Sequence, residues 1–149
     1  MMKVTIRPFE DHDIPSMASI RAQEWATEAF WQERIREYLR KEHSPRQALS
    51  ARAAFVAVQE GKVVGFVAGH RTRRYGCEGE LQWINVVKAK HGCGAAGELL
   101  SKMSAWFVEQ KALRICVDVD PKNAAARNLY AKYGARPLHQ HWIGKTSLP

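Results

Sequence analysis

The sequence has few cysteines and no long apolar run. Its three cysteines, Cys77, Cys93 and Cys116, form no Cys-x-x-Cys pair. Neither a disulfide framework nor a zinc site is therefore expected. No apolar run approaches the length of a membrane span, and the first residues lack the apolar core of a signal peptide. We expect a cytoplasmic protein with no metal and no membrane partner.

Linkers and repeats are also missing. No tract rich in proline, glycine or serine interrupts the 149 residues, which predicts one domain over residues 1–149. A chain of this length can bury a core without disulfides or metal. One domain should then carry the whole function.

The formal net charge is +8, which favours anionic ligands somewhere on the surface. Nucleic acid, acidic substrates and phosphorylated cofactors all fit this charge. The basic residues are scattered, however, and the densest cluster is Arg71, Arg73 and Arg74. No RNA-binding or helix-turn-helix signature accompanies them, so nucleic acid is not favoured as a partner.

Hydrophobic periodicity predicts an alternation of helices and strands. The expected elements are a strand at 3–7, a helix after 11–13, a helix through 31–39, a hairpin of strands at 54–59 and 63–70, a strand at 81–87, a helix over about 96–107, a strand around 113–119, a helix over 126–133, and short strands at 135–139 and 140–144. This order predicts an α+β fold in which about four helices flank one mixed, mostly antiparallel sheet.

A glycine-rich segment, His91-Gly92-Cys93-Gly94-Ala95-Ala96-Gly97, lies between an expected strand and an expected helix. Unpaired backbone amides and the positive end of the helix favour phosphate at such a place. Lys88 and Lys90 add positive charge beside it, and glycines allow close approach of the backbone to a ligand. The segment therefore predicts an anion site.

The three glycines of this segment also spell Gly-x-Gly-x-x-Gly, and Asp118 lies near the distance at which a dinucleotide fold places its ribose-binding acid. A nicotinamide-binding enzyme is thus an alternative. The hairpin-like strands before the segment and the short chain after Asp120 weigh against it. A P-loop needs Lys-Ser/Thr after its last glycine, where this sequence has Glu98-Leu99.

Two motifs carry a family resemblance. Ile84-Asn85-Val86, followed by the 91–96 segment and Leu99-Leu100, resembles the acyl-CoA pyrophosphate signature of the GNAT superfamily, usually Arg/Gln-x-x-Gly-x-Gly/Ala. The run over 123–135 resembles the family's Asn-x-x-Ala-x-x-Leu-Tyr-x-x-x-Gly-Phe helix. His91 stands where arginine or glutamine is usual, and Ala135 stands where an aromatic is usual. These departures keep open a CoA-binding module without turnover.

The resemblance implies an N-acetyltransferase that uses acetyl-CoA and a primary amine, either a small molecule or a peptide. By the same resemblance, the amides of Val86 and Val87 hold the pantetheine arm. The loop that holds the pyrophosphate consists of His91, Gly92, Cys93, Gly94, Ala95 and Ala96. Asn123 and Tyr130 also belong to the cofactor site, and Tyr130 matches the family tyrosine that protonates the departing thiolate.

Glu80 is the leading candidate for the base, since it stands at the head of the strand where several GNAT enzymes place a glutamate. Alternation would put Gln82, Ile84 and Val86 on its side of the strand. The alternative bases are Glu78, Glu24, Glu28 and His70. Cys93 has no evident base partner, so a covalent mechanism is not expected.

The acceptor pocket could be lined by aromatic residues of the N-terminal helical region, namely Trp25, Phe30, Trp31 and Tyr38. A homodimer is also possible from the sequence.

Overall fold

The computed structural model describes residues 3–120, 122–132, 134–139 and 142–145. Its strands are β1 Thr5–Pro8, β2 Ala48–Gln59, β3 Lys62–Thr72, β4 Gly79–Val86, β5 Ile115–Asp118, β6 Arg136–His139 and β7 Trp142–Lys145. Its α-helices are α1 Ile14–Ala22, α2 Glu28–Leu39, α3 Ala95–Glu109 and α4 Ala124–Lys132. Short 3-10 turns are η1 Asp11–Asp13, η2 Arg74–Gly76 and η3 Lys88–Lys90.

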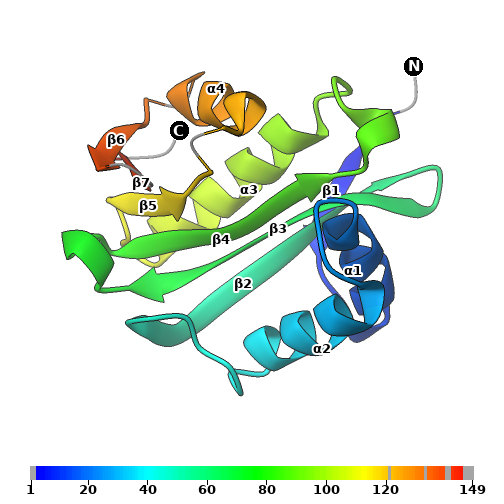
Figure 1. Ribbon diagram of the computed structural model, residues 1–149, viewed down its shortest axis with the longest axis horizontal. Helices are drawn as coiled ribbons and strands as arrows, with labels where there is room; N and C mark the ends of the chain where they lie inside the picture. The colour runs from blue at the N-terminus through cyan, green and yellow to red at the C-terminus, as the bar shows by residue number, and fades with distance from the viewer. Residues whose placement is uncertain (1–2, 121, 133, 140–141, 146–149) are drawn as a thin grey trace.

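The strands form one sheet in the order β1-β2-β3-β4-β5-β7-β6 (Figure 1). Neighbouring strands are antiparallel except β4 and β5, which are parallel because α3 connects them. The predicted α+β fold, with helices flanking a mixed and mostly antiparallel sheet, is therefore confirmed.

Some boundaries differ from the prediction. Strand β2 begins at Ala48 rather than at residue 54, and β5 begins at Ile115 rather than at Leu113. Leu113 lies before the strand with its side chain 55% exposed, and its amide donates to the carboxylate of Glu78 instead of to a strand neighbour. The predicted strand over 140–144 corresponds to β7; its first two residues, 140 and 141, lie outside the described residues.

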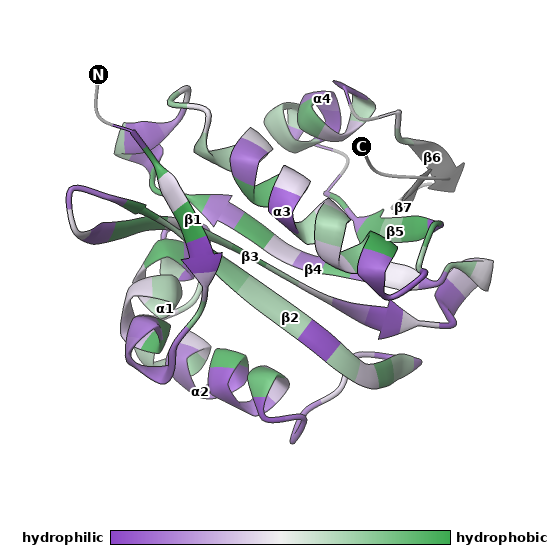
Figure 2. Ribbon diagram, turned by 180° about the vertical axis from the view of Figure 1, so that it is seen from behind, coloured by the Kyte–Doolittle hydropathy of each residue, from purple (hydrophilic) through white to green (hydrophobic). Residues whose placement is uncertain are grey.

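Helices cover both faces of the sheet (Figures 1 and 2). On one face, α1 and α2 pack on β2, β3 and β4 through a cluster centred on Ile35, Phe66 and Trp83. On the other face, α3 packs through a second cluster that includes Leu99 and Phe107. The central strands β2 and β3 alternate their apolar residues between the two layers, as a sheet covered on both faces requires.

Close packing of α3 depends on two glycines in the strands beneath it. A Cβ atom at Gly79 would lie 2.6 Å from the Phe107 ring, and one at Gly69 would lie 3.0 Å from it. Real Cβ atoms do not come as close as the first distance, so the phenyl ring needs a glycine at position 79. The start of β4 is thereby held firmly under α3.

Candidate active site

Strand β4 contains a bulge at Gln82. Leu81 is opposite Gly69 and Trp83 is opposite Ala68, so Gln82 has no partner on β3. In a regular strand Leu81 and Trp83 would share a face, but here Leu81 packs under α3 and Trp83 packs under α2. The extra residue reverses the alternation along the strand.

Because of this bulge, the prediction that Gln82, Ile84 and Val86 share one side of the strand with Glu80 is wrong. Ile84 and Val86 pack against the cluster under α3, whereas Glu80 is bonded to His70 on the face covered by α2. Past the bulge, Trp83 shares the face of Glu80.

Strands β4 and β5 pair over a short distance and then separate. Their pairing runs from Gly79 opposite Ile115 to Leu81 opposite Val117. Beyond Leu81, β4 continues to Val86 with β3 as its pairing neighbour, and Figure 1 shows β4 running on past the end of β5. The second half of β4 therefore has a backbone edge that β5 does not cover.

The direction of the backbone groups at the end of β4 follows from the ladder with β3. The amide of Val87 donates to the carbonyl of Val64 over 2.8 Å. Because the two edges alternate along an antiparallel strand, the backbone groups of Val86 point to the uncovered edge. The carbonyl of Val86 there meets Nε2 of His91 at 2.9 Å. Of the two predicted pantetheine-binding amides, that of Val86 faces the gap and that of Val87 is engaged in the sheet.

The glycine-rich loop ends in the first turn of α3. Gly92 and Gly94 both have φ of +88°, a left-handed conformation that favours glycine. The first bond of the helix runs from the amide of Glu98 to the carbonyl of Gly94 over 3.2 Å, so the amides of Gly94, Ala95 and Ala96 have no acceptor within the helix. The amide of Cys93 donates to the carbonyl of Lys90. The loop thus presents donors beside the gap, at the positive end of α3.

A cavity of about 220 Å³ opens where β4 and β5 begin to separate. Its lining is mostly polar: Arg21, Pro45, Arg74, Glu80, Leu81, Gln82, Trp83 and Asp118. A larger and shallower hollow of about 500 Å³ lies between β1 and α3 and meets the glycine loop at Gly94 and Gly97. Of these two cavities, the smaller one is lined by the buried carboxylate of Glu80 and lies at the gap between β4 and β5.

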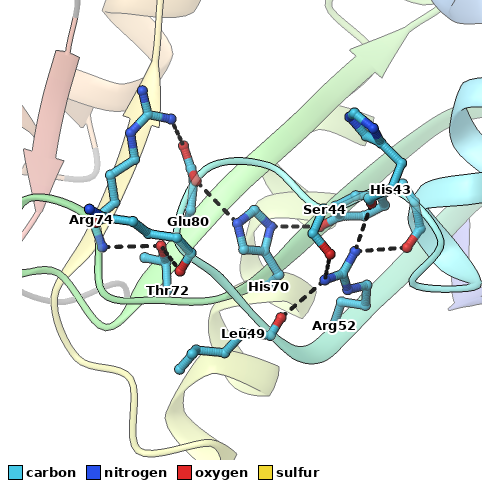
Figure 3. Close-up of polar contacts among 10 residues, drawn as sticks. His43, Ser44, Leu49, Arg52, His70, Thr72, Arg74 and Glu80 are labelled. Carbon is cyan, nitrogen blue, oxygen red and sulfur yellow. Dashed lines mark hydrogen bonds and ion pairs between the residues drawn. The ribbon is translucent and has the colours of Figure 1, made fainter.

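Glu80 lies at the end of a buried chain of polar contacts (Figure 3). The hydroxyl of Tyr38 is 2.8 Å from Nδ1 of His70, and Nε2 of His70 is 3.1 Å from Oε1 of Glu80. Nη1 of Arg74 donates to Oε2 of Glu80 over 3.3 Å. Glu80 is only 3% exposed and His70 is fully buried. The carboxylate therefore has partners on both oxygens while it reaches the cavity.

Tyr130 lies in α4 and packs with the cluster under α3. Burial raises the pKa of Tyr130, and the nearby positive charge of Arg21 partly opposes this shift. The phenol consequently stays protonated across the physiological range and remains a hydrogen-bond donor. Arg21 belongs to α1, so the two side chains come from helices that pack on opposite faces of the sheet.

Arg21 is a functional candidate that the sequence did not single out. Its guanidinium lies 4.7 Å above the Trp31 ring, and its Nη1 donates to Oδ1 of Asn85 over 3.3 Å. Burial lowers the pKa of Arg21, against the opposing influence of Glu24 and Tyr130. An arginine near the end of α1 has no sequence pattern of its own, and only the fold brings it to the cavity.

The other residues that the sequence predicted as bases or cofactor contacts make different interactions. Glu78 accepts the amides of Leu113 and Arg114 at 2.8 and 3.0 Å, and these bonds lower its pKa. Glu28 is exposed in the first turn of α2. Glu24 is exposed and its contact with Asn85 is long, at 3.5 Å. Asn123 caps α4, since its Oδ1 accepts the amide of Ala126 at 3.0 Å.

The four predicted pocket aromatics divide into two pairs. Trp31 and Tyr38 are buried in the core under α2, and Tyr38 is the first member of the chain to Glu80. Trp25 and Phe30 are 58% and 39% exposed and lie 5.9 Å apart, ring centre to ring centre. The sequence did not indicate that Tyr38 and His70 are in contact. Their contact depends on the pairing of β3 with β4 and on the position of α2.

The family model for the acetyltransferase (GNAT) family matches residues 17–135. This chain therefore belongs to the GNAT acetyltransferase family.

Among curated proteins, an uncharacterized N-acetyltransferase of Mycobacterium tuberculosis and one of Mycobacterium bovis are each 34% identical over 83 residues. The match covers 56% of this chain and 52% of each relative. The chain thus spans about half the length of the curated relatives it matches.

Solved structures share the fold over nearly the whole chain. Ard1 from Thermoplasma volcanium has a TM-score of 0.74 and 24% identity, and the match covers 98% of this chain and 99% of that one. A PaiA N-acetyltransferase from Thermoplasma acidophilum, solved in complex with coenzyme A, has a TM-score of 0.70 and 13% identity, covering 97% and 99%. Within the described part of this chain, no helix has the length and apolar character needed to cross a membrane.

Proposed function

We propose that this protein is an N-acetyltransferase that moves the acetyl group of acetyl-CoA to a primary amine by direct attack within a ternary complex. The observation that carries the proposal is the separation of β4 from β5 between a buried carboxylate and the start of α3, where the amides of Gly94, Ala95 and Ala96 have no acceptor within the helix. The family membership and the coenzyme A complex of the PaiA relative support the choice of donor.

Acetyl-CoA fits the gap through its peptide-like arm and its phosphates. The amide of Val86, at the strand edge that β5 does not cover, suits a carbonyl of the pantetheine arm, while the carbonyl of Val86 already meets Nε2 of His91. The amides of Gly94, Ala95 and Ala96 suit the pyrophosphate. Lys88 and Lys90, on the turn before the loop, add positive charge. His91, Gly92 and Cys93 complete the loop, and Asn123 holds the start of the helix that carries Tyr130.

Glu80 acts as the base in this proposal. The acceptor arrives as an ammonium ion, and only its neutral amine can attack the thioester carbon. The carboxylate takes one proton from the ammonium, directly or through one water. The nitrogen lone pair then forms the C–N bond, while the carbonyl electrons move to oxygen and give a tetrahedral oxyanion. A second proton passes from the nitrogen to solvent as the amide forms, and Glu80 then releases its own proton to solvent.

Tyr130 acts as the acid. When the oxyanion collapses, the C–S bond breaks and its electron pair remains on sulfur. The Tyr130 hydroxyl gives its proton to that sulfur, and solvent restores the proton to the phenol. Its burial keeps the hydroxyl protonated before the step. The overall reaction converts an ammonium and a thioester into an amide, a thiol and one released proton.

A thioester-consumption assay with a panel of amines tests the proposal. The panel should include small polyamines, amino acids and short peptides with free N-termini, because the acceptor class is open between small molecules and peptides. We expect free CoA to appear with at least one amine, together with an equimolar amide identified by mass spectrometry. Tight CoA binding without turnover for any amine would instead identify a non-catalytic acyl-CoA-binding module.

A further inference from the structure

The contact chain behind Glu80 has a defined direction of hydrogen bonding. An ionised carboxylate only accepts, and a neutral imidazole has one donor and one acceptor nitrogen. If Glu80 is ionised, Nε2–H of His70 donates to it, and Nδ1 accepts the proton of the Tyr38 hydroxyl. Every donor in the chain then has an acceptor.

The reverse arrangement leaves a proton without a partner. If Nδ1 of His70 carried a hydrogen, it would donate to the Tyr38 oxygen, and the hydroxyl proton would need another acceptor. Among the described residues, the Tyr38 hydroxyl has no second hydrogen-bond partner. A buried donor without an acceptor is costly. The arrangement with an ionised Glu80 and a neutral His70 is therefore favoured.

Tyr38 is itself held firmly. Nη1 of Arg52 donates to its carbonyl over 2.8 Å, and the guanidinium lies 4.7 Å above its ring. Arg52 also donates to the Ser44 hydroxyl and the Leu49 carbonyl (Figure 3). Burial raises the pKa of the Tyr38 phenol, so the hydroxyl stays protonated and can donate at neutral pH.

The second oxygen of Glu80 faces Arg74 and the cavity. Cys116 is the partner of Glu80 on β5. The titratable or charged groups that face Glu80 from the surrounding elements are His70 of β3, Arg74 of η2, Tyr38 of α2, Arg21 of α1, Cys77 before β4, and Cys116 and Asp118 of β5. His70 is the group that contacts the oxygen turned away from Arg74.

Resting on the proposed function, we propose that Tyr38 and His70 are positioning residues. Tyr38 holds His70 as the Nε2–H tautomer, and His70 holds Glu80 ionised, with its free lone pairs directed to the acceptor amine. Neither residue touches the reacting atoms. Their contribution is to the charge and orientation of the base.

The pH dependence of kcat/KM tests this proposal. His70→Leu removes the donor, so the charged form of the carboxylate loses a stabilising contact. We expect the acidic limb of the profile to move to higher pH by about one unit, with an unchanged Kd for acetyl-CoA. His70→Gln offers an amide N–H at a similar reach and should bring the limb back toward the wild-type position. Tyr38→Phe should move the limb in the same direction by less, because His70 then loses its tautomer preference.

Matched measurements separate this proposal from the base assignment. Ser104→Ala removes a buried hydroxyl of α3 that bonds the Leu100 carbonyl, so the limb should not move in this variant. If Glu80→Gln abolishes the limb but His70→Leu and Tyr38→Phe leave it in place, the positioning proposal is overturned and the base assignment stands. If Glu80→Gln keeps the wild-type limb, the base assignment itself fails. Should His70→Leu not fold, Tyr38→Phe decides, and an unmoved limb overturns the proposal.

Discussion

The two halves of β4 differ in how they meet their neighbours. The first half, Gly79 to Leu81, is paired on both sides and carries a buried carboxylate with partners on both oxygens. The second half, Trp83 to Val86, is paired with β3 and leaves its other edge uncovered. A fully paired segment can orient one side chain, whereas an uncovered edge offers backbone groups. In the proposed function, one strand thus supplies chemistry from its first half and cofactor binding from its second.

Removal of the carboxylate in the first half should have the largest effect. Glu80→Gln keeps the shape but cannot take a proton from the ammonium. We expect kcat/KM to fall by about 10²–10⁴-fold and the acidic limb of the pH profile to disappear. Glu78→Gln is a matched control, since Glu78 is bonded to two backbone amides outside the cavity. Equal losses in the two variants would contradict the assignment.

Tyr130→Phe should have the next largest effect. The ring and its packing under α3 survive, while the proton donor to the sulfur is lost. We expect kcat to fall by about 10²-fold, at the lower end of the range for proton transfer, with little change in acetyl-CoA affinity. Steady-state kinetics and a binding isotherm on both proteins provide the measurement. Near-normal turnover would make Tyr130 a packing residue.

Gly94→Val tests the glycine-rich loop that follows β4 and precedes α3. No atom lies within 4 Å of a Cβ placed at Gly94, so the substitution causes backbone strain and obstructs an approaching phosphate without an internal clash. We expect acetyl-CoA to bind about 10-fold more weakly or worse, a loss of about 1.4 kcal/mol or more. Gly61→Val is the control, because Gly61 has φ of +77° in the β2–β3 turn and is equally open. The control should lose stability but keep its affinity.

His91→Ala should have the smallest effect. The His91 ring is exposed and contacts the Val86 carbonyl, while the proposed phosphate donors are amides of the loop. We expect acetyl-CoA affinity to change by less than about 5-fold, as for the loss of one exposed hydrogen bond. Calorimetry measures it. A loss as large as that of Gly94→Val would mean that the side chain, and not the backbone, dominates anion binding.

Much of the fold could be predicted because most elements have a regular hydrophobic period. The start of β2 could not, since Ala48 to Arg52 pairs irregularly with β3 and shows no apolar alternation. Leu113 fits the alternation of β5, yet it lies outside the strand, with its side chain exposed and its amide bonded to Glu78. Local patterns miss boundaries that a tertiary contact sets.

The candidate site was predictable in its residue types but not in its contacts. Glu80 and His70 were both named as candidate bases, but their pairing depends on the register of β3 and β4. That register passes through the bulge at Gln82, which has no sequence mark because the strand remains apolar around it. Tyr38 comes from α2, 32 positions before His70, and only the packing of the helix on the sheet joins them.

The most direct test of the separation between chemistry at Glu80 and cofactor binding at the glycine-rich loop after β4 is calorimetric titration of acetyl-CoA into Glu80→Gln and Gly94→Val, with turnover measured on the same samples. The account predicts that Glu80→Gln binds acetyl-CoA as the wild type does but hardly turns over. It predicts that Gly94→Val binds weakly yet keeps substantial turnover at saturating acetyl-CoA. Loss of affinity in Glu80→Gln together with unchanged affinity in Gly94→Val would contradict it.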